Sequence, residues 1–371
     1  MKPWLRSFRV KNFKAIADSG TVALGKITVF VGYNGSGKSS LVEALETYQQ
    51  TLLHGHQQAL QRWGGFGHAC NKHAVADDRV RRRIEFSATF GAKTGATIRH
   101  EIAIGTDASG RILDMPVERI ALPRNVVVDR SQIAASYRGG EDRSWFFDLP
   151  NDHRDTLRQV WDWQFLSMHA DAMGHPTPAH QLPTRVRLRR DGLNIAEFLR
   201  DIYGLDQNAF DGIVDVMGYV LPYAKALATR VSADGLPQTM LELAEKQFTV
   251  PGWMLSTGTV RLLALLALLR HPSPPPLIII EELENGLDPR CVHLLVDEIR
   301  NATEGGQTQV VVTTHSPYLL DLFHVSHLVL VERREDGGAR FRRPADSLAV
   351  QQWAKTYTPG QLYTMSVLER K

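Results

Sequence analysis

The sequence predicts an α/β fold, a mixed β-sheet core covered by helices, with an antiparallel β-subdomain and a helical insertion. Three observations predict it. The apolar run at 26–31 is followed by a glycine-rich turn and then by helical spacing. Two more apolar runs, 277–282 and 309–317, have the composition of buried parallel strands. Residues 84–90 and 97–104 alternate apolar and polar side chains, as the strands of an antiparallel sheet do.

The glycine-rich turn fits the phosphate-binding loop pattern G-x-x-x-x-G-K-S/T at every fixed position. A helix is predicted to open directly after it, over 40–48. Such a turn is an anion site, because unpaired backbone N–H groups and the helix dipole converge on it. We expect Lys38 to reach the β- and γ-phosphates of a nucleotide and the Ser39 hydroxyl to ligate Mg²⁺. The residues predicted to bind the nucleotide here are Asn34, Gly35, Ser36, Gly37, Lys38, Ser39 and Ser40.

The composition is that of an ordinary soluble globular protein, with 43% hydrophobic and 22% charged residues in a chain of 371. Its 43 basic and 40 acidic residues nearly balance, so the net charge of +3 implies nothing about nucleic acid. Cys70 and Cys291 are far apart and indicate no disulfide framework. The longest apolar run, 262–269, is too short to span a bilayer, and residues 1–6 lack the apolar core of a signal peptide. We therefore expect a cytoplasmic protein with no membrane partner.

Along the chain we predict three regions, 1–130, 131–225 and 226–371. The second region is mostly polar and helical, with helical spacing at 194–203 and 210–220, and it interrupts the core as an insertion. The third region begins with a hairpin, or with a strand and a helix, that leads back to the core. No long heptad run occurs in the chain, so we expect no coiled-coil arm.

The apolar run at 277–282 ends in two carboxylates, Glu281 and Glu282, which is a Walker B pattern. Parallel strands of this kind end at the carboxyl edge of the sheet, beside the phosphates. We expect Glu281 to hold the Mg²⁺ shell and Glu282 to polarise the attacking water. The usual first acid of this motif is Asp. Because Glu281 is one methylene longer, we expect it to coordinate Mg²⁺ through water.

Two other short motifs flank this strand along the chain. Ser256-Thr257-Gly258 precedes a strongly apolar helix, so a hydroxyl and a glycine stand at a helix N-terminus. An ordinary capped helix is the alternative interpretation. His315 ends the next predicted strand, and we expect it to hydrogen-bond the γ-phosphate or the attacking water, a purely structural histidine being the alternative.

These motifs resemble the RecF/SMC/OLD-like branch of ABC-type AAA ATPases. The opening, RVKNFKAI … ITVFVGYNGSGKSSLVEAL, is similar to the start of RecF/SMC-like members. The run EELENGLDP is similar to the E-E-P-E variant and D-loop of OLD and RecF-like ATPases, with Leu283 in place of Pro, and TTHS matches the H-loop. Ser256 and Gly258 match the ABC signature S-x-G, whereas Thr257 departs from the common Gly. The similarity is strong over 1–50 and 250–330.

The resemblance implies ATP and Mg²⁺ as cofactors and ATP hydrolysis, with Glu282 and His315 as the catalytic residues. It also implies a homodimer or a higher homo-oligomer, in which Ser256 and Gly258 of one subunit contact the nucleotide bound by the other. No Q-loop is evident, since nothing in its surroundings marks the one candidate, Gln132. No Toprim nuclease or HNH motif follows His315, so we expect a stand-alone ATPase.

Our leading functional hypothesis is an ATP-hydrolysing molecular switch that dimerises around nucleotide and controls a separate effector protein, in anti-phage defence or DNA repair. The alternative is a nucleic-acid-binding clamp that ATP locks on DNA, which two arginine clusters favour. A transporter motor is disfavoured by the helical insertion and the K-N-F-K opening. The candidates for contacts with nucleic-acid phosphates are Arg81, Arg82, Arg83, Arg187, Arg189 and Arg190.

Two further clusters each allow two interpretations. Residues 54–78 are predicted to be irregular, and their histidines and cysteine are either a zinc site or, since the spacing is not standard, polar surface residues. This first cluster consists of His54, His56, His68, Cys70 and His73. The aromatic residues of the insertion form either its own small core or a docking surface for the effector. They are Trp145, Phe146, Phe147, Trp161 and Trp163.

Overall fold

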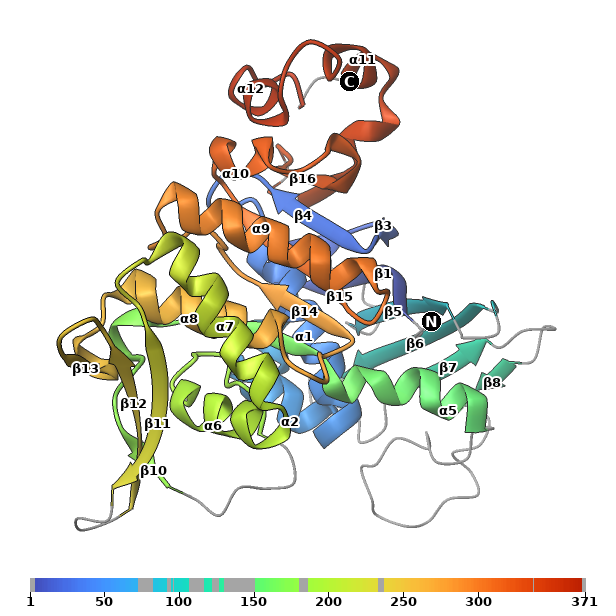
Figure 1. Cartoon of the computed structure of the whole chain (residues 1–371). Coiled ribbons are helices and arrows are strands. Elements are labelled where there is room, and N and C mark those ends of the chain that lie inside the picture. Colours follow the sequence, from blue (N-terminus) through green and yellow to red (C-terminus); the bar gives the residue numbers. More distant parts are fainter. Residues whose placement is uncertain are drawn as a thin grey trace, which may run out of the picture. The chain divides into compact units, whose positions relative to one another are not determined.

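The computed structural model describes residues 4–72, 83–91, 95, 97–106, 117–121, 127–129, 151–179, 186–232, 237–335 and 337–368. The chain divides into two compact units, one formed by Met1–Trp163 with Phe323–Lys371 and the other by Gln164–Leu322. Figure 1 labels the helices and strands of both units. The predicted insertion, 131–225, is therefore divided between the two units.

The first unit contains an antiparallel sheet in the order β2-β1-β5-β6-β7-β8, with β3 paired to β1. In β1, Phe8, Val10 and Phe13 are buried, and the residues between them are partly exposed, so one face of the sheet is apolar. Val10 lies opposite Phe86, which continues this apolar face onto β5. The strands predicted at 84–90 and 97–104 are confirmed. The bounds are β1 (Trp4–Phe13), β2 (Ile16–Asp18), β3 (Val22–Ala23), β5 (Arg83–Gly91), β6 (Thr97–Gly105), β7 (Val117–Ala121) and β8 (Val127–Asp129).

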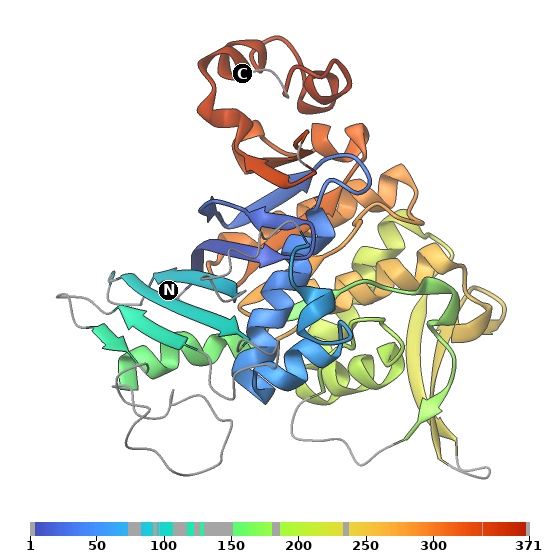
Figure 2. The same ribbon diagram turned by 180° about the vertical axis from the view of Figure 1, so that it is seen from behind.

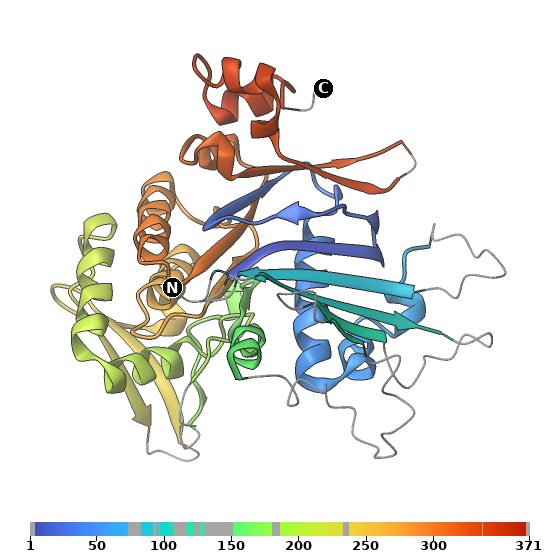
Figure 3. The same cartoon turned by 90° about the vertical axis from the view of Figure 1, so that its right-hand side faces the viewer.

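A second group of strands in this unit precedes and follows the phosphate loop. The strand before the loop, β4 (Ile27–Val31), is buried at every residue. It pairs in parallel with β16 (Leu328–Arg333), which pairs antiparallel with β17 (Ala339–Arg342), as Figure 3 shows. Helix α1 (Lys38–His54) follows the loop and packs on β1, which is seen from behind in Figure 2. The other helices of the unit are α2 (His56–Gln61), α3 (Phe66–Ala69), α5 (Asn151–Arg158), α11 (Leu348–Trp353) and α12 (Pro359–Thr364), with 3₁₀ turns at Gln159–Asp162, Val325–His327 and Pro344–Asp346.

The prediction of irregular structure after residue 54 is wrong where the structure describes the segment, because α2 and α3 lie there. Gly55 and Gly65 have positive φ angles of 84° and 93° and stand at the N-termini of these two helices. The glycines therefore mark helix ends and not one continuous loop. Both helices bury an apolar side chain, Leu60 and Phe66 respectively.

A fully buried polar network joins α1 to the antiparallel sheet. The hydroxyl of Tyr48 lies 2.6 Å from Nδ1 of His100 on β6, and Nε2 of His100 lies 2.8 Å from Oε1 of Glu118 on β7. All three side chains are buried, at 0%, 0% and 2% exposure. Complete burial raises the pKa of Tyr48 well above its usual value, and the charge of Glu118 adds to this effect. The network therefore keeps a neutral tyrosine of the phosphate-loop helix in the core.

The second unit contains a parallel group of three strands, in which β14 (Leu277–Ile280) lies between β9 (Gln164–Leu166) and β15 (Gln309–Thr314). The two predicted apolar strands are confirmed, and each ends a few residues before its predicted limit. The predicted hairpin is also present, as β11 (Ala226–Ser232) and β12 (Gln238–Ala244), flanked by β10 (Thr177–Pro178) and β13 (Thr249–Pro251). The helices are α6 (Ile195–Leu205), α7 (Gln207–Val220), α8 (Thr257–Leu269), α9 (Pro289–Glu304) and α10 (Pro317–Asp321), with 3₁₀ turns at Ala170–Ala172 and Gly252–Met254.

Helix α8 forms the centre of the second unit. It is buried at every residue from Thr259 to Leu269, and it packs against α6, α7 and α9. A helix that is apolar all round needs such a position, because it has no polar face to turn to water. Among the residues that the structure describes, no helix is long and apolar enough to cross a membrane.

The aromatic residues of the predicted insertion fall in different places. Trp163 is buried in the first unit, with ring centroids 6.0 Å from Tyr48 and 6.3 Å from Phe90. It therefore belongs to the core of that unit. Trp161 is half-buried. Trp145, Phe146, Phe147 and the Q-loop candidate Gln132 lie outside the described residues.

Candidate functional site

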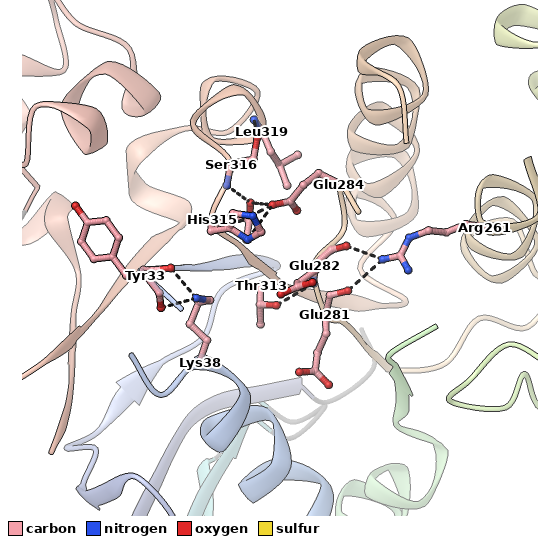
Figure 4. A network of polar contacts seen from close by, with 12 residues as sticks. Tyr33, Lys38, Arg261, Glu281, Glu282, Glu284, Thr313, His315, Ser316 and Leu319 are labelled. Atoms are coloured by element: carbon pink, nitrogen blue, oxygen red, sulfur yellow. Dashed lines mark hydrogen bonds and ion pairs between the residues drawn. The ribbon is translucent and has the colours of Figure 1, made fainter. Parts of the chain in front are cut away.

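In the phosphate loop of the first unit, the lysine side chain folds back onto the backbone of the loop. Lys38 is only 7% exposed, and its Nζ donates hydrogen bonds to the carbonyl oxygens of Gly32, at 2.6 Å, and Tyr33, at 3.0 Å (Figure 4). The loop thus fixes the ammonium group through carbonyl oxygens, which are acceptors that phosphate oxygens can replace.

The glycines of the loop are required by its packing against the β16–β17 hairpin. An added Cβ on Gly32 would lie 2.2 Å from the carbonyl oxygen of Val331, and one on Gly37 would lie 2.6 Å from Cβ of Ala339. Gly37 also has a φ of +113°, which other residues rarely adopt. The loop is therefore shaped by strands that lie almost 300 residues further along the chain, since Arg333 Nη1 also donates to the Gly35 carbonyl across a separation of 298 residues.

Three observations describe the residues that are predicted to bind nucleotide. Gly37 is the N-cap of α1 and supplies no side-chain acceptor to the first N–H groups of the helix. The buried Ser36 hydroxyl has no hydrogen-bond partner among the described residues. The Ser39 side chain is exposed, as are Asn34 and Gly35, while Ser40 is half-buried. The predicted binding residues therefore lie on one loop, in which the Ser36 hydroxyl and the first N–H groups of α1 have no side-chain acceptor among the described residues.

The second unit places Glu282 in a strained backbone conformation. Its φ is +49°, in the left-handed region, which costs about 1–3 kcal/mol for a residue other than glycine. Two hydrogen bonds hold it there: its N–H donates to Oγ1 of Thr313 at 3.0 Å, and its carbonyl accepts from Arg261 at 2.5 Å (Figure 4). Strain that is enforced from two sides is typical of functional sites.

Arg261 connects helix α8 to both acids of the Walker B motif. Its guanidinium donates to the carbonyl oxygen of Glu281 at 3.2 Å as well as to that of Glu282. The side chain is 3% exposed, and burial lowers its pKa, while the charges of Glu284 and Glu282 act in the opposite direction. Arg261 thus fixes the backbone at the end of β14 from the helix that follows the S-x-G motif.

The side chain of Glu281 forms an ion pair with Arg190. Nη2 of Arg190 lies 2.6 Å from Oε1 of Glu281, and the two side chains are 26% and 12% exposed. No other hydrogen bond of the Glu281 carboxylate occurs among the described residues. One carboxylate oxygen is therefore occupied by an internal cation, and the other remains available to a ligand.

A third acid, Glu284, lies beside the histidine of the H-loop motif. Its Oε1 accepts hydrogen bonds from Oγ1 of Thr314, at 2.6 Å, and from the backbone N–H of His315, at 3.2 Å. Nδ1 of His315 lies 3.8 Å from the same oxygen, and half of the histidine side chain is exposed. Oε2 of Glu284 is buried without a partner among the described residues, so this carboxylate has spare accepting capacity (Figure 4).

The S-x-G motif forms the start of α8. The exposed Ser256 is its N-cap and accepts a hydrogen bond from the N–H of Thr259 at 3.1 Å. An added Cβ on Gly258 would lie 2.7 Å from the carbonyl oxygen of Gly286 in the D-loop motif. The capped-helix interpretation therefore holds for this unit by itself.

Three residues around the Walker B acids were not predicted from the sequence, namely Arg190, Arg261 and Glu284. The repeated acids of EELE were a signal for Glu284, but nothing local marks the two arginines. Arg190, a candidate for contacts with nucleic-acid phosphates, forms an ion pair with Glu281. Arg189 pairs with Asp191 at 2.7 Å, and Arg187 is also engaged, while Arg83 is exposed. Arg81 and Arg82 lie outside the described residues.

The histidine and cysteine cluster does not come together as a metal site. Among the described residues, no group of three or more His, Cys, Asp or Glu side chains is placed to hold a metal ion. His54 and His68 are exposed, and His56 and Cys70 are buried, so the polar-surface interpretation is wrong for the last two. His73 lies outside the described residues.

The fold and these motifs define a P-loop protein of the ABC-type ATPase class. The sequence profile of the family described as "AAA domain, putative AbiEii toxin, Type IV TA system" matches residues 27–321. This match covers well over half of the chain, so the chain belongs to that family. No curated protein sequence matches the chain.

Solved structures of SMC heads share the fold. The SMC head bound to the C-winged helix domain of ScpA superimposes with a TM-score of 0.58 at 15% identity, covering 91% of this chain and 97% of that one. The head domain with an extended coiled coil, bound to the C-terminal domain of ScpA, from Pyrococcus furiosus gives 0.56 at 14% identity, covering 95% and 100%. The predicted α/β fold of an ABC-type ATPase is confirmed.

Proposed function

We propose that this protein binds ATP with Mg²⁺ and hydrolyses it as a molecular switch. The observation that carries the proposal is the phosphate loop, in which the Lys38 ammonium is held on backbone carbonyls next to a helix N-terminus without a side-chain cap. Membership of an AAA family supports it. In a loop of this shape the lysine exchanges its carbonyl partners for oxygens of the terminal phosphates.

The residues fit a Mg²⁺–nucleotide complex. Each unit carries an oxygen ligand of the kind that Mg²⁺ prefers, directly or through water: the Ser39 hydroxyl in the first unit and the free oxygen of Glu281 in the second. When bound, Mg²⁺ neutralises charge on the β- and γ-phosphate oxygens. Glu282 acts as the base that takes a proton from the attacking water, and its fixed backbone sets the direction of the carboxylate. His315, whose backbone is bonded to Glu284, contributes a polar contact to the water or the γ-phosphate.

The test of nucleotide binding is the change Lys38→Ala. Loss of the only loop ammonium should weaken ATP affinity by at least about tenfold, since hydrogen bonds to charged groups contribute about 1.5–3 kcal/mol. Lys355→Ala, at an exposed position outside the loop, is the matched control. Binding is measured with a fluorescent ATP analogue and folding by thermal denaturation. Unchanged affinity in folded Lys38→Ala protein contradicts the proposal.

We further infer that ATP brings two copies together through the exposed start of α8. Ser256 and the close approach of Gly258 to Gly286 supply a hydroxyl and a compact backbone surface at a helix N-terminus. Ser256→Arg should then abolish ATP-dependent dimerisation in light scattering and leave ATP binding by the monomer intact. Thr257→Arg tests the neighbouring exposed position. Dimerisation that survives Ser256→Arg would mean that the serine is only a helix cap.

The proposed switch acts on a separate effector, in anti-phage defence or DNA repair. Two observations support a partner: the similar SMC heads are bound to domains of ScpA, and the matched family is described by a toxin–antitoxin system. The effector should co-purify with Glu282→Gln protein in ATP and not with the Ser256→Arg variant. Equal recovery with both variants contradicts control by the nucleotide state.

A nucleic-acid clamp is the second candidate, because four basic side chains line a cavity of about 240 Å³ on the antiparallel sheet, namely Arg9, Lys11, Arg99 and Arg119. Glu85 and Glu101 also line this cavity, and Arg9 and Lys11 are paired with Asp18 and Glu85. Arg99 and Arg119 are exposed, and neither forms an ion pair within the described part of the chain. If duplex DNA binds there, each change to Ala should shallow the slope of log affinity against log salt by about 0.9. An unchanged slope removes this candidate.

A further inference from the structure

We propose that Arg190 is a positioning residue for Glu281: it holds one oxygen of this carboxylate so that the other is presented to the Mg²⁺ of a bound nucleotide. The inference rests on the proposed function and deepens it, since it assigns a role to a side chain that no motif contains. It starts from the ion pair between Arg190 Nη2 and Glu281 Oε1 at 2.6 Å, which joins residues 91 positions apart.

The backbone of Arg190 is fixed by the same strands that fix Glu281. The N–H of Ser167, just after β9, donates to the Arg190 carbonyl at 2.9 Å. The N–H of Glu281 donates to the carbonyl of Leu166, the last residue of β9, at 2.9 Å. β9 and β14 are paired in register immediately before these contacts. Glu281 therefore directly follows β14, and Arg190 lies on a turn whose backbone is hydrogen-bonded to the residue after the neighbouring strand β9.

The turn that carries Arg190 is built for rigidity. Asn194 spans it, because its Nδ2 donates to the Arg187 carbonyl at 2.8 Å and its Oδ1 accepts from the N–H of Arg189 at 2.8 Å. Gly192 closes it with a φ of +76°, and a Cβ there would lie 2.7 Å from Cε of Met173. A side chain supported in this way delivers its guanidinium with little loss of backbone entropy.

The longer acid explains why such support is needed. Glu has one more rotatable bond than the Asp that is usual at this position, and freezing it costs conformational entropy. Arg190 already restrains the carboxylate, so less remains to be lost when a metal binds. Carboxylate oxygens offer about four acceptor sites in all, so the group can serve a guanidinium and a hydrated cation together. The carboxylate here uses Oε1 for Arg190, and Oε2 has no hydrogen bond among the described residues.

The adjacent arginine provides a matched control. The Arg189 side chain is 58% exposed and pairs with Asp191 on the same turn, at 2.7 Å. It has the same charge and lies one residue away, but no contact joins it to Glu281. Arg189→Ala therefore changes the net charge as much as Arg190→Ala does, and on the same turn. It leaves the ion-pair partner of the Glu281 carboxylate in place.

The experiment is a Mg²⁺ titration of the binding of a non-hydrolysable fluorescent ATP analogue to the full chain. Arg190→Ala should raise the Mg²⁺ concentration at half-maximal enhancement by about 10–100-fold, as loss of outer partners of metal ligands does. Arg189→Ala should stay within about twofold of the wild type. Arg190→Lys, which keeps a charge but only a single point contact, should lie between them. Thermal denaturation without nucleotide verifies that each variant is folded, and Arg190→Lys replaces Arg190→Ala if the latter is not.

A double change separates positioning from general charge effects. The shorter side chain of Glu281→Asp falls short of Arg190, so in that background Arg190→Ala should shift the midpoint by less than about twofold. The proposal is overturned if Arg190→Ala leaves the midpoint Mg²⁺ concentration unchanged or lowers it. A lowered midpoint would mean that Arg190 competes with Mg²⁺ for Glu281. If the wild-type chain binds no nucleotide, or if its nucleotide binding does not depend on Mg²⁺, both the proposed function and this inference are contradicted. Failure confined to Arg190→Ala overturns the inference alone.

Discussion

Two polar clusters in this protein differ in burial, in backbone strain and in how completely their hydrogen bonds are satisfied. Tyr48, His100 and Glu118 are 0%, 0% and 2% exposed and form a linear chain of short hydrogen bonds. The cluster around the Walker B acids is half-buried, keeps Glu282 at a φ of +49°, and leaves Oε2 of Glu284 without a partner among the described residues. The first cluster is closed and saturated, and the second is strained and incomplete.

The difference indicates where chemistry can happen. A saturated buried network stabilises one arrangement and offers nothing to a ligand. Strain and unsatisfied acceptors cost free energy in the folded protein, and they persist where a ligand or a reaction uses them. We therefore expect changes in the closed cluster to affect stability and changes in the open cluster to affect ATP turnover.

The largest effect should follow Glu282→Gln, which keeps the size of the side chain and removes the base. We expect ATP turnover to fall about 10²–10⁴-fold, the usual contribution of general base catalysis, with the melting temperature unchanged. Turnover is measured by phosphate release and nucleotide occupancy by equilibrium binding. Undiminished turnover would transfer the role to Glu281 or Glu284.

The closed cluster is tested by Tyr48→Phe, which removes one hydroxyl and leaves Nδ1 of His100 buried without its partner. We expect a loss of about 1–3 kcal/mol in the free energy of unfolding and little change in turnover per folded molecule. Tyr318→Phe is the control, because that hydroxyl contacts the Pro289 carbonyl from a side chain that is 45% exposed. A variant as stable as the wild type, with impaired turnover, would reverse the comparison.

An intermediate case is the D-loop residue Asp288, the N-cap of α9. It accepts hydrogen bonds from the N–H groups of Arg290 and Cys291, and Asp288→Ala should cost about 1 kcal/mol of stability at neutral pH. The hydrogen bond from the Cys291 thiol and the backbone bonds hold the pKa of Asp288 below its usual value. This stabilisation is present above the pKa of the unfolded chain and is lost as the pH falls through the lower folded pKa.

The measurement for Asp288 is the free energy of unfolding of both proteins across the acid range. The gap between them should be constant at neutral pH and close in acid. Asp215→Ala, at an exposed position on α7, should show no such gap. A gap that widens in acid would contradict a cap that works through the charged carboxylate.

The smallest effect should come from an exposed ion pair that belongs to neither cluster. Arg230 on β11 and Glu242 on β12 are diagonal neighbours in the hairpin and form an ion pair at 3.0 Å, with side chains 69% and 23% exposed. Arg230→Ala should change the free energy of unfolding by no more than about 0.5 kcal/mol, as is usual for surface pairs. Chemical denaturation of the two proteins gives this difference. A larger loss of unfolding free energy would show that this surface ion pair stabilises the hairpin more than an ordinary exposed pair does.

Local elements were predictable from the amino-acid sequence where their signals lie within a few residues. The phosphate loop was predicted because glycine, lysine and serine must stand at fixed spacing, and β14 and β15 because fully buried strands are apolar throughout. The same locality explains the error after residue 54, where glycines that end short helices resemble the glycines of a loop.

The meeting of charges that are distant in the sequence became visible only in the folded chain. Arg190 was grouped with its arginine neighbours in the sequence, yet strand pairing between β9 and β14 brings it to Glu281. Arg261 lies inside an apolar helix and donates to two carbonyls at the end of β14, and His100 joins Tyr48 to Glu118 across three elements. Side chains of opposite charge attract wherever folding places them, and that placement is a property of chain topology, which no local pattern of residues records.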